Sequence, residues 1–374
     1  MKGREERQCR AYFLFNEELL IPKDHPLRGI KRRVEEELAR MQPCFREAYA
    51  GVGRPSIPPE QLIKATLLQA LYSIRSERRL CEEIGYSILY RWFLNLPLDE
   101  PMWDHSTFSK NRQRFAEHGL MRRFFEGSVA QAIQEEAASQ EHFSMDGTLI
   151  EAWASMKSVR PKGEEGDGDQ AGWPGDSNGW VDWRGEKRSN ATHQSRTDPE
   201  ARLARKGPGQ ETKLAHSLQV LMENRNGLVM GIAVAEANGE AEREEGKGLL
   251  KRARQRYWLR PKTAGADKGF DDGEFLEELE RELGVVPHVA TREGPMVSED
   301  AAGLARRRAR RRQKTKGYQL SQKCRKRVEE IFAWLKTIGG LRRTRFIGRW
   351  KTQLYAYAAA AVYNFLRLTR LVSA

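Results

Sequence analysis

Three acidic residues in the 374-residue sequence stand where they could serve phosphodiester chemistry. Asp146 lies at the centre of an expected strand over residues 143–150, and Asp267 ends a short expected strand over residues 262–267. Glu329 lies on an expected helix that follows a basic stretch. Two aspartates on neighbouring strands and a glutamate on a docked helix can hold two Mg²⁺ ions roughly 3.5–4 Å apart. Such ions activate the attacking oxygen and stabilise the leaving oxygen of an in-line displacement.

The types of donor narrow the choice of metal. Carboxylate oxygens suit Mg²⁺, for which Mn²⁺ can substitute. The four cysteines are scattered and no Cys/His cluster occurs, which argues against zinc. Asp146, Asp267 and Glu329 are therefore the candidate catalytic and metal-binding residues, and two Mg²⁺ ions are the expected cofactor.

The neighbours of Glu329 add a second signal. Arg325 lies four residues before it and Lys336 seven residues after it. At about 100° per residue, these offsets bring all three side chains to nearly one face of a single helix. A carboxylate flanked by two cations on one face suits a protein that holds a metal ion next to DNA phosphates.

Each of the three positions also has an ordinary structural explanation. An Asp-Gly pair such as Asp146-Gly147 is more often a turn, and Asp267 could cap the turn or helix that follows it. Glu329 with its neighbouring cations could be a solvated, ion-paired helix face. The metal site is favoured because all three residues fall at suitable places in one order of strands and helices.

The elements that must position these residues divide the sequence in two. Residues 1–138 are expected to be all-helical, with helical apolar spacing after Pro58 and Pro59. Residues 139–374 are expected to be α/β or α+β. Their predicted strands cover residues 143–150, 214–222, 228–235, 262–267 and 285–290, and their predicted helices cover residues 241–257 and 274–283. Asn226-Gly227 marks a hairpin between the second and third strands.

Two stretches of the second half look irregular. Residues 160–212 are rich in Gly, Asp, Glu, Ser and Asn, so we expect a long, partly mobile excursion. The role of its tryptophans, Trp173, Trp180 and Trp183, stays open between local packing and contact with a partner. Residues 291–322 are the second irregular stretch, and their basic part, residues 301–322, contains a run of arginines.

The charge of the chain points to a polyanionic partner. The formal net charge is +13 and the pI is about 9.6. Residues 301–351 alone hold 18 Lys and Arg against two Glu, so the surplus is local. Basic residues there and on the helix after residue 104 are candidate DNA contacts. They are Arg325, Lys336, Arg306, Arg307, Arg308, Arg310, Arg311, Arg312, Lys110, Arg112 and Arg114.

Composition excludes several other classes of protein. The length suggests two or three domains, and 39% hydrophobic residues can form a sizeable core. The polar start of the chain is unlike a signal peptide, and the scattered cysteines fit a reducing compartment. The longest apolar stretch, residues 354–366, is too short to span a bilayer. We therefore expect a cytoplasmic protein with no membrane partner.

The motifs together resemble the DDE transposases of bacterial insertion sequences, specifically the insertion-sequence-five-like group. The resemblance covers most of the chain, and its motifs are jointly specific. The motifs are Gly53-Arg54-Pro55-Ser56-Ile57-Pro58-Pro59-Glu60, Asp104-His105-Ser106-Thr107-Phe108, Met145-Asp146-Gly147-Thr148-Leu149-Ile150-Glu151-Ala152-Trp153-Ala154-Ser155, Thr197-Asp198-Pro199-Glu200-Ala201-Arg202, Leu221-Met222-Glu223-Asn224-Arg225-Asn226-Gly227, Ala266-Asp267-Lys268-Gly269-Phe270 and Arg327-Val328-Glu329-Glu330-Ile331-Phe332-Ala333-Trp334-Leu335-Lys336.

The resemblance implies an α+β protein: an N-terminal helical DNA-binding domain and a ribonuclease-H-like catalytic core with a long insertion. It implies Asp146, Asp267 and Glu329 as the metal-binding triad. The family pattern of Tyr, Arg, Glu and Lys is matched at Arg325, Glu329 and Lys336, but Gln322 stands at the Tyr position. Tyr318 is near but out of register.

The implied partner is double-stranded DNA, both the terminal inverted repeats and the target, bound by a homodimer in the bacterial nucleoid. The expected reaction is metal-dependent cleavage at the element ends, followed by strand transfer. Two alternatives stay open at this point. One is a ribonuclease-H-like nuclease or resolvase without strand transfer, and the other is a non-catalytic DNA-binding protein derived from a transposase.

Overall fold

The protein is described from a computed structural model, which covers residues 17–51, 56–162, 189–205, 207, 209–292 and 299–372. Helices make up its first part, in agreement with the apolar spacing. Pro59 opens one helix at a position where its missing N–H costs nothing, and Ser76 and Ser87 cap the next two. The helices are α1 (Glu17–Leu20), α2 (Pro26–Arg40), α3 (Gln42–Ala48), α4 (Pro59–Leu71), α5 (Glu77–Tyr86), α6 (Ile88–Leu94), α7 (Ser106–Glu117) and α8 (Leu120–Gln134).

A mixed sheet follows, and its central strand carries Asp146. Strand β1 (His142–Glu151) pairs antiparallel with β5 (Lys213–Glu223), which pairs antiparallel with β6 (Leu228–Glu236). On its other side β1 pairs parallel with β7 (Thr263–Ala266), and β7 pairs parallel with β8 (Val286–Val289). The β5–β6 turn contains Gly227 at φ 68°, as the Asn-Gly signal predicts.

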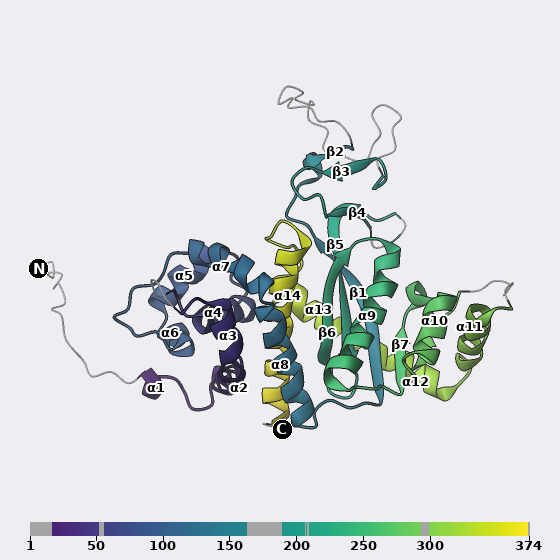
Figure 1. The fold of residues 1–374 in the computed structure, drawn as a ribbon, viewed down its shortest axis with the longest axis horizontal. Coiled ribbons are helices and arrows are strands. Elements are labelled where there is room, and N and C mark those ends of the chain that lie inside the picture. The colour runs from purple at the N-terminus through teal and green to yellow at the C-terminus, as the bar shows by residue number, and fades with distance from the viewer. Residues whose placement is uncertain are drawn as a thin grey trace, which may run out of the picture.

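Helices cover the sheet and join it to the first part of the chain (Figure 1). Helix α9 (Gly239–Tyr257) packs on β5 and β6, and α10 (Gly273–Arg281) contacts β8. The C-terminal helix α14 (Arg349–Val372) packs against β6, α8, α4 and α2. One cluster of buried apolar side chains therefore extends from the N-terminal helices into the sheet.

The expectation of an irregular stretch at residues 291–322 is wrong for most of its length. Most of residues 301–322 fall in two helices, α11 (Ala301–Arg312), capped by Asp300, and α12 (Lys316–Arg325), capped by Thr315. Ala305 and Ala309 are buried, and α11 packs against α10. Alanine and arginine are both good helix formers, so a dense run of arginines need not be irregular.

The expected excursion at residues 160–212 also contains some regular structure. The short strands β2 (Val159–Pro161) and β3 (His193–Ser195) pair with each other, and β4 (Arg202–Ala204) pairs with β5. Trp173, Trp180 and Trp183 lie outside the described residues. Among the helices that are described, none is long and apolar enough to cross a membrane.

Candidate active site

The two candidate aspartates lie at equivalent register positions on adjacent parallel strands. Ser144 of β1 is opposite Gly265 of β7, so two residues further along each chain the register places Asp146 beside Asp267. Asp146 is in the strand rather than in a turn, and its Oδ1 accepts a hydrogen bond from the N–H of Gly147 (2.8 Å). Asp267 caps the 3₁₀ turn Lys268–Phe270 by accepting from the N–H of Gly269 (2.8 Å).

The expected cations lie along the same strand. The Arg325 guanidinium donates from Nη1 to Asp146 Oδ2 (2.7 Å), and Lys336 Nζ donates to Thr148 Oγ1 (2.6 Å). Asp146 and Thr148 are two residues apart on β1, so their side chains share one face of the sheet. Arg325 and Lys336 therefore both reach the face that carries the first candidate carboxylate.

The prediction of one continuous helix through Arg325, Glu329 and Lys336 is wrong. Helix α12 ends at Arg325, and a new helix, α13 (Val328–Thr337), begins after two turn residues. At the junction the N–H groups of Arg327 and Glu329 bond to carbonyls three residues back, as in a 3₁₀ helix. This tighter winding changes the angular offset between Arg325 and Glu329 from the α-helical value.

The three carboxylates are not gathered around one point. Glu329 is exposed in the first turn of α13, Asp146 is paired with Arg325, and Asp267 is engaged by the turn that it caps. No group of three or more His, Cys, Asp or Glu residues in the described ranges could hold a metal ion. The donor types suit Mg²⁺, but in this arrangement the side chains do not fit a metal centre.

Gln322, at the family's Tyr position, has a structural role. Its Nε2 donates to the carbonyl oxygen of His288 at 2.8 Å, so it ties α12 to β8. Tyr318 lies one turn earlier and packs edge-on against the ring of His288, with 6.2 Å between ring centroids. On the same side of the sheet, His142 Nε2 lies 3.0 Å from the Ser321 hydroxyl. Burial lowers the pKa of His142 to about 4, with a further contribution from nearby His288.

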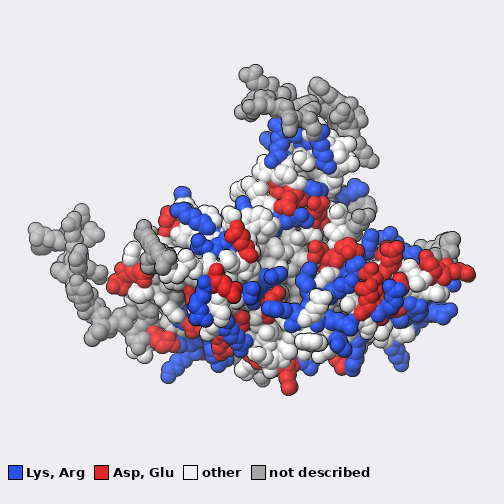
Figure 2. All heavy atoms as spheres, viewed as in Figure 1, with Lys and Arg blue, Asp and Glu red and all other residues white. Residues whose placement is uncertain are grey.

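The arginine run forms one side of a helix–helix contact. Arg306 binds both carboxylate oxygens of Asp271, at 2.9 and 2.7 Å, and Arg308 binds Glu280 of α10 at 2.6 Å. Arg312 also pairs with Glu280. Figure 2 shows Lys/Arg and Asp/Glu side chains interleaved over the part of the molecule that holds α10 and α11. Arg311 is exposed, and Arg307 and Arg310 make further interactions.

The basic side of α7 faces partly inward. Arg112 pairs with Glu77, and its guanidinium carbon lies 4.8 Å from the ring centroid of Phe346. Arg114 lies over the ring of Tyr49, 4.5 Å from its centroid. Lys110 is exposed. Arg112 and Arg114 therefore contribute to packing inside the protein.

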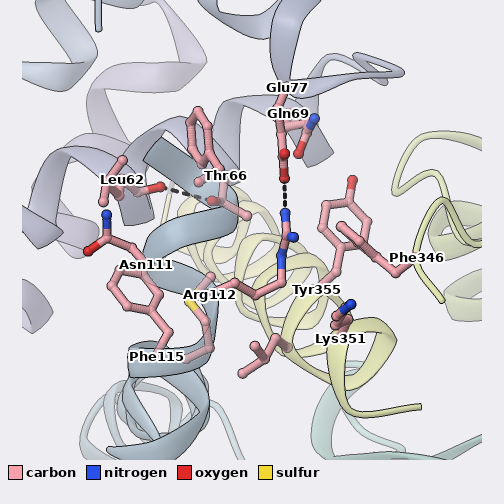
Figure 3. Close-up of a pocket in the computed structure, with 13 residues that line it drawn as sticks. Leu62, Thr66, Gln69, Glu77, Asn111, Arg112, Phe115, Phe346, Lys351 and Tyr355 are labelled. Atoms are coloured by element: carbon pink, nitrogen blue, oxygen red, sulfur yellow. Dashed lines mark hydrogen bonds and ion pairs between the residues drawn. The ribbon is translucent and has the colours of Figure 1, made fainter. Parts of the chain in front are cut away.

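Arg112 also lines a small pocket between the N-terminal helices and α14. Figure 3 shows its side chain extending across this pocket to Glu77, beside Phe346 and Tyr355. The amide nitrogen of Gln69 is buried here and has no hydrogen-bond partner among the described residues. The pocket belongs to the contact between the two halves of the chain and lies on elements other than those that carry the three carboxylates.

Sequence reasoning missed two polar contacts made by residues of the sheet. Thr148 accepts a hydrogen bond from Lys336. Side chains alternate between the two faces of a strand, and this rule alone places Thr148 on the same face as Asp146. The fully buried pair His216–Asp198 joins β5 to the chain before β4, with 3.1 Å between His216 Nε2 and Asp198 Oδ2. Asp198 lies in a quoted family motif, but no local pattern indicated its partner.

Comparison with known families agrees with this architecture. Residues 15–114 match the Transposase domain (DUF772), and residues 175–365 match the Transposase DDE domain. The second match contains Asp267 and Glu329, while Asp146 precedes it.

Comparison with individual proteins is less informative. No curated protein matches the sequence. One solved structure, titled "Mos1 transposase paired-end complex with left transposon end", matches at 10% identity over 78% of this chain and 83% of that chain. Its TM-score of 0.18 is too low to support a shared arrangement. The DDE match spans just over half of the residues, so the chain belongs to the DDE transposase family, of insertion-sequence type, and is a DNA transposase.

Proposed function

We propose that residues 139–374 form a ribonuclease-H-like core of the insertion-sequence-five-like group. The order β6-β5-β1-β7-β8 supports this proposal, because three antiparallel strands are followed by two parallel ones and β1 lies at the centre. The first candidate carboxylate lies on that central strand, and the second follows the strand next to it.

The proposed catalytic set is Asp146, Asp267 and Glu329. The observation that carries it is the register of β1 and β7, which brings Asp146 and Asp267 to equivalent positions. Arg325 and Lys336 bracket Glu329 in the chain and contact β1 on either side of Gly147. We propose that both cations bind DNA phosphates once DNA lies along this face.

The proposed cofactor is a divalent metal, Mg²⁺ with Mn²⁺ as a substitute. When bound, it would activate the attacking oxygen and stabilise the leaving oxygen. Because Asp146 is paired with Arg325, its carboxylate has to leave that partner before it can join Asp267 and Glu329. DNA phosphates are the natural new partner for Arg325, since arginine binds phosphate as well as carboxylate through charge-assisted hydrogen bonds.

The proposed substrate is double-stranded DNA, as terminal inverted repeats and as target. Residues 1–138 are proposed to recognise the repeats as a homodimer on DNA, with Lys110 as the exposed basic contact of α7. Arg311 is proposed as a phosphate contact of α11. Water would cleave the phosphodiester at the element end, and the freed 3′-OH would then attack target DNA.

The test uses purified full-length protein, element ends with their flanking DNA, and a target plasmid. Asp146→Asn, Asp267→Asn and Glu329→Gln should each abolish cleavage while DNA binding stays within about twofold. Glu330→Gln is the matched control, because Glu330 is exposed and adjacent to Glu329. Full cleavage by any of the three variants would refute that residue's role. Hydrolysis without joined products would favour a nuclease.

A further inference from the structure

An exposed tryptophan follows the strand that carries the first candidate catalytic residue, Asp146. Trp153 follows the end of β1, and its side chain is 53% exposed, whereas Ala152 and Ala154 on either side are buried. Exposed positions continue at every second residue further along the chain, at Ser155 and Lys157. A large aromatic ring is thus held on the surface by a backbone whose neighbouring side chains are anchored in the protein.

Arg343 fixes the position of this tryptophan. It pairs with Glu151 in a parallel β-bridge, and the adjacent backbone bonds join Glu151 to Arg342 and Thr344. The Arg343 side chain donates from Nη2 to the carbonyl oxygen of Trp153 (2.9 Å), and its guanidinium carbon lies 5.5 Å from the centroid of the ring. The cation occupies one side of the indole, and the exposed area leaves room on the ring for another flat group.

The charge around Trp153 is suited to phosphates. Four exposed basic residues lie on the segments next to Trp153: Lys157 and Arg160 follow it in the chain, and Arg342 and Arg343 belong to the segment that is bridged to Glu151. Within the described ranges, no carboxylate lies within ion-pairing distance of any of them. This is the opposite of α11, where Arg306, Arg308 and Arg312 are bound to acidic side chains.

We propose that Trp153 and these four cations, here called the Trp153 surface, form a stacking site for an unpaired base of the DNA substrate. Bases inside a duplex already stack on each other, so an exposed indole face is best used by a base outside the duplex. Arginine and lysine around the ring would hold the phosphates on either side of that base.

The location fits a role in handling DNA near the reaction. Trp153 lies seven residues beyond Asp146, which is about 23 Å at about 3.3 Å per residue. Along one strand of a duplex, at about 3.4 Å per nucleotide, that length corresponds to roughly seven nucleotides. The inference rests on the proposed function only in placing the cutting centre at Asp146.

Equilibrium binding of fluorescein-labelled oligothymidylate of about 20 residues tests the stacking site, with a duplex of equal length measured in parallel. Trp153→Ala should weaken single-strand binding about tenfold, as loss of one stacked base does, and should leave duplex binding within about twofold. Trp153→Phe should keep most of the affinity. Trp258→Ala, which removes a 74% exposed tryptophan at the end of α9, is the matched control and should change neither.

Three outcomes would overturn the proposal: unchanged single-strand binding in Trp153→Ala, equal weakening of single-strand and duplex binding, or an equal effect of Trp258→Ala. Melting temperature measured on the same samples shows whether each variant is folded. Because the readout is binding, cleavage by Asp146→Asn would refute the proposed catalytic set without affecting this result.

Discussion

Arg325 Nη1 lies 2.7 Å from Asp146 Oδ2, so the end of α12 holds the carboxylate that β1 presents at the candidate active site. Both side chains are mostly buried, at 22% and 17% exposed, which makes the contact stronger than a surface ion pair. A cation in direct contact with a carboxylate competes with any metal ion for the same oxygen atoms.

Removal of Arg325 should therefore tighten metal binding in the absence of DNA. A charge-assisted hydrogen bond contributes about 1.5–3 kcal/mol, and about 1.4 kcal/mol corresponds to tenfold in affinity. We expect Arg325→Ala to bind Mn²⁺ at least about tenfold more tightly, as measured by electron paramagnetic resonance titration. Lys326→Ala removes an exposed cation one residue away and serves as control. Equal affinities in both variants would mean that Arg325 does not compete.

Arg306 and Arg311 should behave differently, although they belong to the same arginine run. Arg306 binds both oxygens of Asp271, whose side chain is fully buried and also accepts from the N–H of Arg292 (2.6 Å). Arg306→Ala would leave a buried carboxylate without its cation, and we expect unfolding free energy to fall by about 3 kcal/mol. Arg311→Ala should change it by less than about 0.5 kcal/mol. Urea denaturation measures both, and similar losses would contradict this assignment.

Glu37 should make the protein less stable as pH rises. Burial raises the pKa of Glu37 to about 7, and Arg40, 3.6 Å from Oε2, offsets only part of this rise. The folded state therefore holds a proton that the unfolded state releases above its ordinary pKa near 4.5. The stability that protonated Glu37 contributes is fully present below the unfolded-state pKa and is lost as pH rises through about 7.

Glu37→Gln should remove this pH dependence. We expect the variant to match the wild type near pH 4 and to be about 2 kcal/mol more stable at pH 8. Denaturant unfolding at both pH values provides the measurement. Glu36→Gln, at an exposed neighbouring position, is a control for the loss of one negative charge. A constant difference between wild type and Glu37→Gln across the range would contradict the prediction.

The differences between sequence-based expectation and structure have physical causes. The alternation of residues 143–150 suffices to place Asp146 in a strand, because a two-residue period is local. The Arg325–Asp146 contact joins residues 179 positions apart, and no local pattern encodes it. The helix that carries Arg306 was not predicted because its sequence is strongly basic. Its apolar stripe consists only of the small residues Ala305 and Ala309.

Asn364 illustrates the same limit within α14. In the sequence it is a polar residue inside an apolar stretch, with nothing to indicate its partner. In the fold, the edge of β6 not paired with β5 faces α14, and Asn364 bonds both backbone groups of Val229 at 2.9 Å. Three turns earlier on α14, Gln353 Oε1 accepts from the N–H of Val234 (2.6 Å).

The spacing of these two amides matches the strand that they serve. Eleven residues of helix rise about 16.5 Å, and the five residues from Val229 to Val234 rise about 16.5 Å along a strand. Helix α14 thus satisfies an edge strand at two points and covers it against pairing with another chain. Asn364 Nδ2 also lies 3.2 Å from Ser128 Oγ on α8, so one amide connects the N-terminal helices with the sheet.

Replacing Asn364 should therefore be costly even though leucine has a similar size. Asn364→Leu leaves the N–H and C=O of Val229 buried without partners, and each such group costs about 1–3 kcal/mol. We expect a loss of about 3 kcal/mol in urea denaturation. Gln353→Leu, at a half-buried position, should lose only about 1 kcal/mol because water can replace its hydrogen bonds. Equal losses at the two positions would show that burial of the edge does not set the cost.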